Sequence, residues 1–362
     1  MTSLVTPGWA FEEVAPADID ATLERQRHDH GDGDRPLVRA SVNNMVVVTQ
    51  SRGAGQRALA TVESLGLSVP SRCVVLIAEP PPPPDGRPRV RSWARVAHHR
   101  YGEGRSEVVW EEVIVHTNVP ARYLPAVVLP LLLPELPVFT WWEGTPPFSE
   151  EVFDELATVT DRLILDLATF VDPVPDLARL ARAAQALGPA VSDCVWGRLT
   201  PWRELLAAPF NGPPLRGAAH AIQRLRVDAV DASAGLELVG WFASRLGWEL
   251  EEVRAVDDVR AARYARGPGL HCEVEVVSTL GSASLTRVEL EVVAAEEPSH
   301  IRVEATPNYL VSTVQTPGQP TARRVGFSSE QGQLAAELQV FGRDRVFEAA
   351  LASAAELVGE EG

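Results

Sequence analysis

The stretch LVRASVNNMVVVTQSRGAGQRALATVESLGLSVPSRCVVLIAE, residues 37–79, decides the fold class. A valine-rich run typical of a strand is followed by a helical pattern over 51–66, and a second apolar strand covers 71–79. Gly66 stands where a helix commonly ends. Two strands joined by a helix predict a parallel pair with a right-handed crossover.

The first half of the chain continues this pattern. Five consecutive prolines, 80–84, predict an exposed loop, although a ligand role for proline-binding proteins is an alternative. Alternating runs at 89–99 and 106–116 predict two antiparallel strands. Further strands are expected at 137–144 and 161–167, with helices at 148–156 and 176–187.

The second half has a different order of elements. A strand (221–230), a helix ending at Gly247 and a strand (248–256) precede three alternating stretches that are typical of a β-meander. The meander is expected at 270–280, 284–294 and 299–308, with edge strands at 308–315 and 322–327 around the turn 316–320, and closing helices at 330–338 and 344–358.

These patterns predict a fold class between α/β and α+β, with two domains that each pack helices on a mixed β-sheet. The expected limits are an N-terminal helix, Ile19 to Arg27, with a flexible link (1–36), an α/β domain (37–187) and an α+β domain (188–362).

The composition excludes several classes of protein. The net charge of −16 disfavours nucleic acid and anionic membranes as partners, because binding phosphates requires clustered cations. The longest apolar stretch, 126–139, is interrupted by three prolines and is too short to span a membrane. The first residues do not resemble a signal peptide, so a cytoplasmic location is expected. The sequence has no lysine, which excludes chemistry that depends on lysine.

No motif for catalysis, cofactor binding or metal binding stands out. Neither a dinucleotide fingerprint nor a nucleotide phosphate loop follows the first strand. Gly53 and Gly55 lie where backbone amides could hold an anion, although a flexible turn is the simpler interpretation. The three cysteines are isolated and typical of buried positions, and the histidines do not converge as metal ligands. We therefore predict no catalytic, cofactor-binding or metal-binding residue.

The segment VWGRLTPWRELLAAPF, residues 195–210, combines aromatic surface with fixed positive charge. Thr200 is placed to cap a helix, and Pro201 is expected at its first position. Trp202 would share a helix face with two leucines, and Arg198 and Arg203 would frame the start of the helix.

Several unusual strings occur together in an order and spacing that resemble the OpcA family, the glucose-6-phosphate dehydrogenase assembly proteins. The strings are PSRCVVLIAE (70–79), VVLPLLLPELPVFTWWEG (127–144), DRLILD (161–166), WGRLTPWRELLAAPFN (196–211) and TPGQP (316–320). The resemblance extends from about residue 37 to residue 357.

The resemblance implies a non-catalytic protein that binds glucose-6-phosphate dehydrogenase, favours its active oligomer and supports NADPH production. The family pattern is carried by five candidate partner-binding residues, Trp141, Trp142, Arg198, Trp202 and Arg203. Tryptophan and arginine are enriched at interface hot spots, but the tryptophans are equally compatible with a core role. An enzyme that binds a sugar phosphate through Arg198 and Arg203, and a purely structural scaffold, are the alternatives. Redox control, which the resemblance links to photosynthetic members, finds no support in the isolated cysteines.

Overall fold

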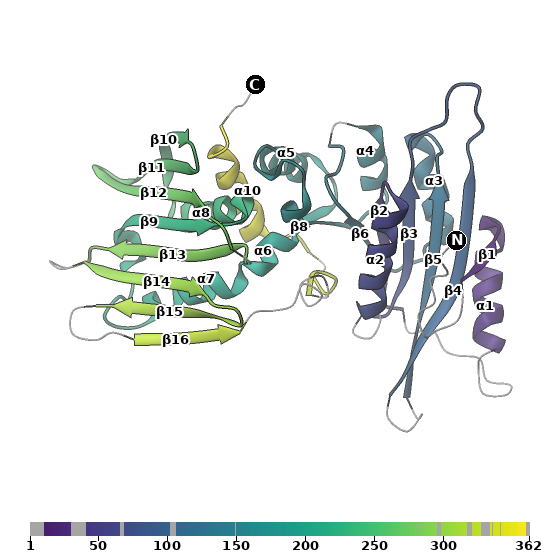
Figure 1. Ribbon diagram of the computed structural model, residues 1–362, viewed down its shortest axis with the longest axis horizontal. Helices are drawn as coiled ribbons and strands as arrows, with labels where there is room; N and C mark the ends of the chain where they lie inside the picture. The colour runs from purple at the N-terminus through teal and green to yellow at the C-terminus, as the bar shows by residue number, and fades with distance from the viewer. Residues whose placement is uncertain are drawn as a thin grey trace. The chain divides into compact units, whose positions relative to one another are not determined.

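The computed structural model describes residues 11–29, 41–65, 69–101, 106–148, 150–281, 283–294, 298–316, 321–326, 334, 336–340 and 342–359 (Figure 1). The expected polar link before residue 37 and most of the turn 316–320 lie outside these residues, as does most of the expected helix 330–338.

The chain divides into two compact units that interleave along the sequence. The first contains Met1–Leu165, Leu187–Val191 and Leu334–Gly342, and the second contains Asp166–Ala186, Ser192–Gln333 and Arg343–Gly362. A division into compact units does not show that each unit folds by itself. The domain limits expected at 37–187 and 188–362 therefore stay a prediction.

The first sheet has eight strands in the order β1-β4-β5-β3-β2-β6-β7-β8. The strands are β1 (Glu12–Val14), β2 (Asn43–Thr49), β3 (Ser71–Ala78), β4 (Val90–Tyr101), β5 (Ser106–Thr117), β6 (Val138–Trp142), β7 (Arg162–Leu165) and β8 (Ala190–Asp193). The helices of this part of the chain are α1 (Ile19–Asp29), α2 (Arg52–Leu65), α3 (Leu124–Val128), α4 (Glu151–Ala157) and α5 (Pro173–Ala186), with short 3-10 turns between them.

The parallel pairing of β2 with β3 across α2 confirms the crossover expected for residues 37–79. β4 and β5 form the expected antiparallel pair. β5, β3, β2, β6 and β7 are parallel throughout, and β2 has a neighbour on each side. The residues of β2 are all buried, as is typical of a strand covered on both faces.

A buried ion cluster fastens α1 to this sheet. Arg72 of β3 donates from Nε to Glu111 of β5 at 2.6 Å and from Nη1 to Asp20 of α1 at 2.8 Å. Arg27 of α1 also contacts the Glu111 carboxylate. Arg72 and Glu111 are almost fully buried, so loss of either charge would leave the other with only one partner of opposite charge, Asp20 for Arg72 and Arg27 for Glu111.

The second sheet also has eight strands, in the order β10-β11-β12-β9-β13-β14-β15-β16. They are β9 (Ile222–Ala229), β10 (Glu249–Val256), β11 (Val259–Gly267), β12 (Leu270–Ser278), β13 (Leu285–Val292), β14 (Ser299–Ala305), β15 (Tyr309–Gln315) and β16 (Thr321–Gly326). The helices are α6 (Cys194–Arg198), α7 (Thr200–Ala207), α8 (Ala232–Leu246) and α10 (Arg345–Glu356).

Both sheets contain parallel and antiparallel pairs and both pack against helices, which confirms the expected fold class. The continuous meander expected over 270–308 is wrong, because β9 lies between β12 and β13. β9 pairs in parallel with β12 and antiparallel with β13, so it joins two separate meanders. β11, which the sequence patterns did not predict, is part of the first of these.

One face of the second sheet is covered by helices. α8 packs on β9 and β12, α7 packs on β14, β15 and β16, and α10 packs closely on α8. Gly240 allows this approach, since a Cβ atom there would lie 2.1 Å from the carbonyl oxygen of Ala350 in α10.

We therefore expect Gly240→Ala to lower the free energy of unfolding by about 3 kcal/mol, because the added carbon meets backbone that can relax only if α10 moves. Urea denaturation followed by circular dichroism measures the effect. Gly212→Ala is the matched control, since nothing lies within 4 Å of its Cβ position and its φ is −138°. Equal stability of the two variants would contradict the close α8–α10 contact.

Candidate functional site

The candidate site lies where the parallel strands of the first sheet end. β2, β3 and β6 point the same way, so their carboxyl ends meet at one edge of the sheet. From β2 the chain continues to β3 and β5 on one side, and β6, β7 and β8 follow on the other. The strand order therefore changes direction at β2. Doubly wound folds bind ligands, often dinucleotides, at such a switch point.

The turn after β2 does not form the anion-binding loop considered from the sequence. α2 begins at Arg52, so Gly53 and Gly55 lie inside the helix instead of in a loop before it. Ser51 occupies the start of the helix, and its Oγ accepts the Ala54 amide N–H at 3.2 Å. A donor that could hold a phosphate is therefore already used within the chain.

The same turn lacks most of the glycines of a dinucleotide-binding fold. That fold uses glycine at the first, third and sixth positions after the strand, for the turn, the approach of the pyrophosphate and helix packing. Residues 50–55 are Gln, Ser, Arg, Gly, Ala and Gly. Gly55 retains the packing role, since a Cβ there would lie 3.1 Å from two carbons of Ile77. Gln50 and Arg52 place side chains where the pyrophosphate would approach, so this turn does not fit a dinucleotide.

Three side chains from separate strand ends form a polar chain at this edge. Arg52 Nη2 lies 3.1 Å from His116 Nδ1, and His116 Nε2 lies 2.7 Å from Glu79 Oε1. Because Arg52 can only donate, His116 Nδ1 is the acceptor. His116 Nε2 lies close to Glu79 Oε1 without the geometry of a hydrogen bond. An acidic residue after the second strand contacts the ribose in dinucleotide-binding folds, whereas Glu79 faces His116 here. The sequence patterns missed this group because its members are 27 and 37 residues apart.

A hollow of about 440 Å³ lies beside the group formed by Arg52, His116 and Glu79, and Glu79 is part of its lining. Trp142 lies along it and packs edge-on against Phe153 at 5.7 Å between ring centroids. The described residues that line it include prolines, apolar side chains and carboxylates but no arginine or histidine: Val48, Gln50, Ala78, Glu79, Pro80, Pro81, Val119, Pro120, Ala121, Leu124, Trp142, Glu150, Glu151 and Val152.

The paired tryptophans of β6 have different environments. Trp142 is 2% exposed, whereas Trp141 is half-buried. Successive residues of a strand point to opposite faces, which accounts for the difference. Trp142 thus has a packing role in the first unit, and its part in partner binding stays a prediction.

The other three candidate residues belong to the second unit and are engaged within it. Arg198 makes two hydrogen bonds to the Asp166 carboxylate, at 2.9 and 2.6 Å. Trp202 is 3% exposed and is buried with the leucines of α7. Arg203 lies over the Trp196 ring at 3.5 Å from its centroid and donates to Thr200 Oγ1 at 2.9 Å.

The expected cap at Thr200 is wrong. α7 includes Thr200 as a helical residue, and Leu199 is the N-cap without a side-chain hydrogen bond. The Thr200 hydroxyl accepts from Arg203 instead, one turn later on the same helix. Arg198, Trp202 and Arg203 therefore make contacts within this unit, and their part in partner binding stays a prediction.

Two carboxylic acids, Asp193 and Glu237, are buried in the same unit as Arg198. Asp193, which caps α6, and Glu237 of α8 are both fully buried. Asp193 Oδ1 accepts the amide N–H groups of Leu167 and Val195, and the side chains of Asp193 and Glu237 hydrogen-bond to one another when one of them is protonated. Burial raises the pKa of Glu237 well above its usual range, and the nearby charges of Asp193 and Asp231 raise it further. Burial likewise raises the pKa of Asp193. The described residues contain no group of three His, Cys, Asp or Glu that could hold a metal ion.

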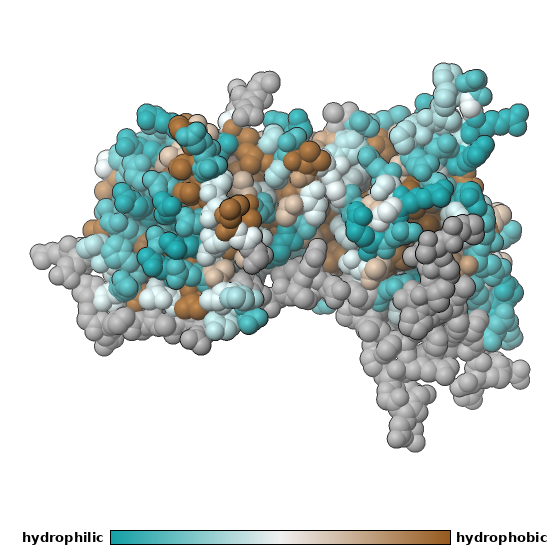
Figure 2. All heavy atoms as spheres, viewed as in Figure 1, coloured by the Kyte–Doolittle hydropathy of each residue, from teal (hydrophilic) through white to brown (hydrophobic). Residues whose placement is uncertain are grey.

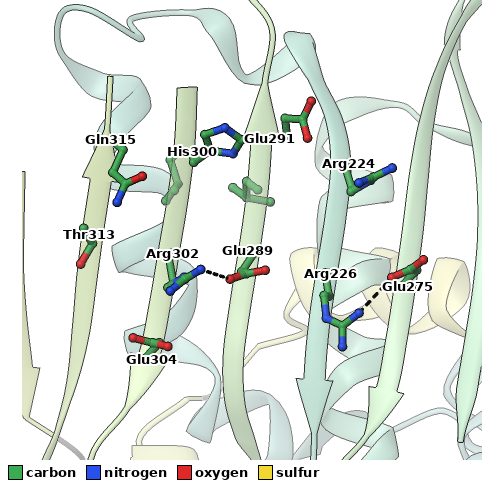
Figure 3. A pocket seen from close by; sticks show the side chains of 12 residues that line it. Arg224, Arg226, Glu275, Glu289, Glu291, His300, Arg302, Glu304, Thr313 and Gln315 are labelled. Carbon is green, nitrogen blue, oxygen red and sulfur yellow. Dashed lines mark hydrogen bonds and ion pairs between the residues drawn. The ribbon is translucent and has the colours of Figure 1, made fainter. Parts of the chain in front are cut away.

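The open face of the second sheet is polar, and Figure 2 shows hydrophilic residues gathered over its strands. Four adjacent strands carry alternating charges in one row, Glu275, Arg226, Glu289 and Arg302 (Figure 3). Arg302 Nη2 lies 2.7 Å from Glu289 Oε1, and Arg226 Nη1 lies 3.2 Å from Glu275 Oε2. The shallow hollow of about 340 Å³ on this face is therefore lined by charges that neutralise one another, as in cross-strand pairs that stabilise a sheet.

Glu237→Gln should make the protein more stable at pH 8. Because the folded-state pKa is raised, the folded protein binds more protons than the unfolded chain between the two pKa values, so stability falls as pH rises through that window. A glutamine at this position does not ionise, so this loss of stability does not occur. Its side-chain amide can also donate a hydrogen bond to Asp193. We expect a gain of about 1–3 kcal/mol at pH 8 and a smaller difference at pH 4.5, since one pKa unit corresponds to about 1.4 kcal/mol. Urea denaturation at both pH values, with the exposed Glu204→Gln of α7 as control, tests this; an unchanged or lower stability at pH 8 contradicts it.

Trp202→Ala should lower the free energy of unfolding by about 3–5 kcal/mol, because it leaves a large cavity under α7. Trp202→Phe retains most of the buried area and should cost less. Thermal and urea denaturation of both variants distinguish a packing role from an exposed docking role, for which the alanine variant would retain the parental stability.

Comparison with known sequences supports one family over most of the chain. Residues 62–182 match the family model for the N-terminal domain of the glucose-6-phosphate dehydrogenase subunit. Residues 189–351 match the model for the C-terminal domain of the same protein.

Curated relatives carry the same family name. A protein of Nostoc punctiforme named "Putative OxPP cycle protein OpcA" is 36% identical over 121 residues, which is 33% of this chain and 26% of that protein. The protein of the same name from Synechococcus elongatus is 27% identical over 243 residues, 61% of this chain and 53% of its own length. The matches thus span about a quarter to a half of these relatives.

Solved structures share the fold at low identity. KijD10, a 3-ketoreductase from Actinomadura kijaniata solved in complex with TDP-benzene and NADP, has a TM-score of 0.50 at 11% identity, covering 87% of this chain and 95% of that chain. This likeness concerns the fold alone. Both family models match in the expected order along the sequence, and the chain belongs to the OpcA family.

Proposed function

We propose that this protein is a non-catalytic partner of glucose-6-phosphate dehydrogenase that binds the enzyme, favours its active oligomer and so supports NADPH production in the oxidative pentose phosphate pathway. The observation that carries the proposal is the match of residues 62–182 and 189–351 to the two domains of a glucose-6-phosphate dehydrogenase subunit. The enzyme is the predicted partner, and the cell's cytoplasm is the predicted location.

The edge of the first sheet supports a role without hydride transfer. A dehydrogenase with this strand order needs a turn through which the pyrophosphate can approach. Gln50 and Arg52 occupy that turn, and Ser51 satisfies a helix N-terminal amide. No helix of the described residues is long and apolar enough to cross a membrane.

The alternative of an enzyme that binds a sugar phosphate through Arg198 and Arg203 is disfavoured by their contacts. Arg198 is held by both oxygens of Asp166, and Arg203 donates to Thr200 and to the Trp196 carbonyl at 2.8 Å. A phosphate would have to displace these internal partners, and the displacement would reduce its binding energy.

A non-catalytic activator changes the rate of its target by binding the competent form more tightly than the incompetent form. A tenfold preference corresponds to about 1.4 kcal/mol of differential binding. An interface of modest size supplies this readily, since single hot-spot residues contribute about 2 kcal/mol or more.

Adding the purified protein to the dehydrogenase of the same organism should raise the rate of NADPH formation and shift the enzyme to a larger oligomer. Spectrophotometry of NADPH absorbance and analytical ultracentrifugation measure the two effects. The protein alone should turn over neither glucose 6-phosphate nor NADP. Binding without a change in rate or oligomer would support the scaffold alternative, and intrinsic turnover abolished by Arg198→Ala would support the enzyme alternative.

A further inference from the structure

We propose that the hollow at the switch point of the first sheet receives an arginine side chain of the partner protein, in the position where related folds hold a dinucleotide. The inference rests on the proposed function for the identity of the partner. Its chemistry comes from the residues of the hollow.

The charge of the hollow selects a cation. Glu79, Glu150 and Glu151 line it, and the described lining residues include no cation. Glu150 and Glu151 are exposed, and the Glu79 side chain is 42% exposed, so all three can reach an incoming group. A phosphate or a carboxylate at this place would be repelled, because its negative charge would lie close to the negative charges of the glutamates.

The neighbouring side chains leave part of this negative charge uncompensated. His116 lies against Glu79, and Arg122, whose guanidinium stands over the Tyr123 ring, interacts electrostatically with Glu151. Among the described residues no ion pair involves Glu150. The partner's cation would therefore complete a site in which His116 lies against one carboxylate and Arg122 is the chain's own cation near another.

The apolar lining favours a side chain with a long aliphatic part and a planar charged group. Pro80, Pro81 and Pro120 line the hollow together with Trp142, whose ring is held by Phe153. An arginine can lay its methylene stem along such surfaces while its guanidinium reaches carboxylates at the rim. The guanidinium is planar and less strongly hydrated than an ammonium, so it loses less hydration on entering a proline-lined space than lysine does.

The net charge of −16 favours the same kind of partner surface, because a strongly acidic protein attracts cationic patches over distance. Binding through this hollow should weaken as ionic strength rises.

The double variant Glu150→Gln/Glu151→Gln tests the site. Isothermal titration calorimetry with the dehydrogenase should show binding at least tenfold weaker than for the parent protein, with a shallower dependence of Kd on salt. The matched control is Asp154→Asn/Glu24→Gln, which removes the same charge from exposed positions, one on α4 and one on α1, outside the hollow. The control should change Kd by less than twofold. Circular dichroism melts of both double variants show whether α4 still folds.

A second measurement identifies the occupant. A photo-crosslinking amino acid at Pro81 should join the dehydrogenase at a segment that contains an arginine, as located by mass spectrometry. If the parent protein fails to bind the dehydrogenase at all, the proposed function is wrong. If the parent binds and both double variants bind equally well, or the crosslinked segment lacks an arginine, the hollow is not the docking site. Micromolar binding of NADP that competes with the dehydrogenase would overturn the inference in favour of a nucleotide site.

Discussion

Parallel pairing of β2 with a strand on each side is the constraint on which the candidate site depends. It brings the ends of β2, β3 and β6 to one edge of the first sheet, and the chain diverges from β2 in two directions. Every side chain of the hollow reaches it from a strand end or from the segments that follow one. Without this order, Glu79, His116 and Trp142 would not share an edge.

The first unit combines the strand order of a doubly wound fold with a turn unsuited to a dinucleotide. Gly55 still lets α2 pack against Ile77, while Gln50 and Arg52 stand where glycines would admit a pyrophosphate. The glycine that lets the helix pack on the sheet is thus present here without the glycines that let a cofactor approach. The acidic, proline-lined hollow that results is suited to a cationic protein side chain, which is consistent with a binding role for a protein of this family.

The second unit uses its charges mainly for its own stability. Arg198 and Asp166 form a two-bond pair, the open sheet face carries alternating charges, and Trp196 anchors α10 through a hydrogen bond from Nε1 to Asp344 at 3.1 Å. The buried carboxyls of Asp193 and Glu237 are the exception, since an ionised carboxylate costs stability when it is buried. Arginine and tryptophan residues of the kind enriched at interfaces can therefore also make contacts within one chain.

The sequence by itself determined the elements whose signals are local. Valine-rich runs, turn residues and the helix end at Gly247 predicted β2, α2, β3 and α8, and long unusual strings were sufficient for the family. Tertiary structure decided what depends on contacts between distant residues. The insertion of β9 between β12 and β13, the burial of Trp142, and the meeting of Arg52, His116 and Glu79 all arise from strand pairing across many residues. The burial of Trp202 depends on the packing of α7 against β14, β15 and β16. Alternation and spacing carry no information about which edge a strand pairs with, and for that reason the candidate site became visible only in the folded chain.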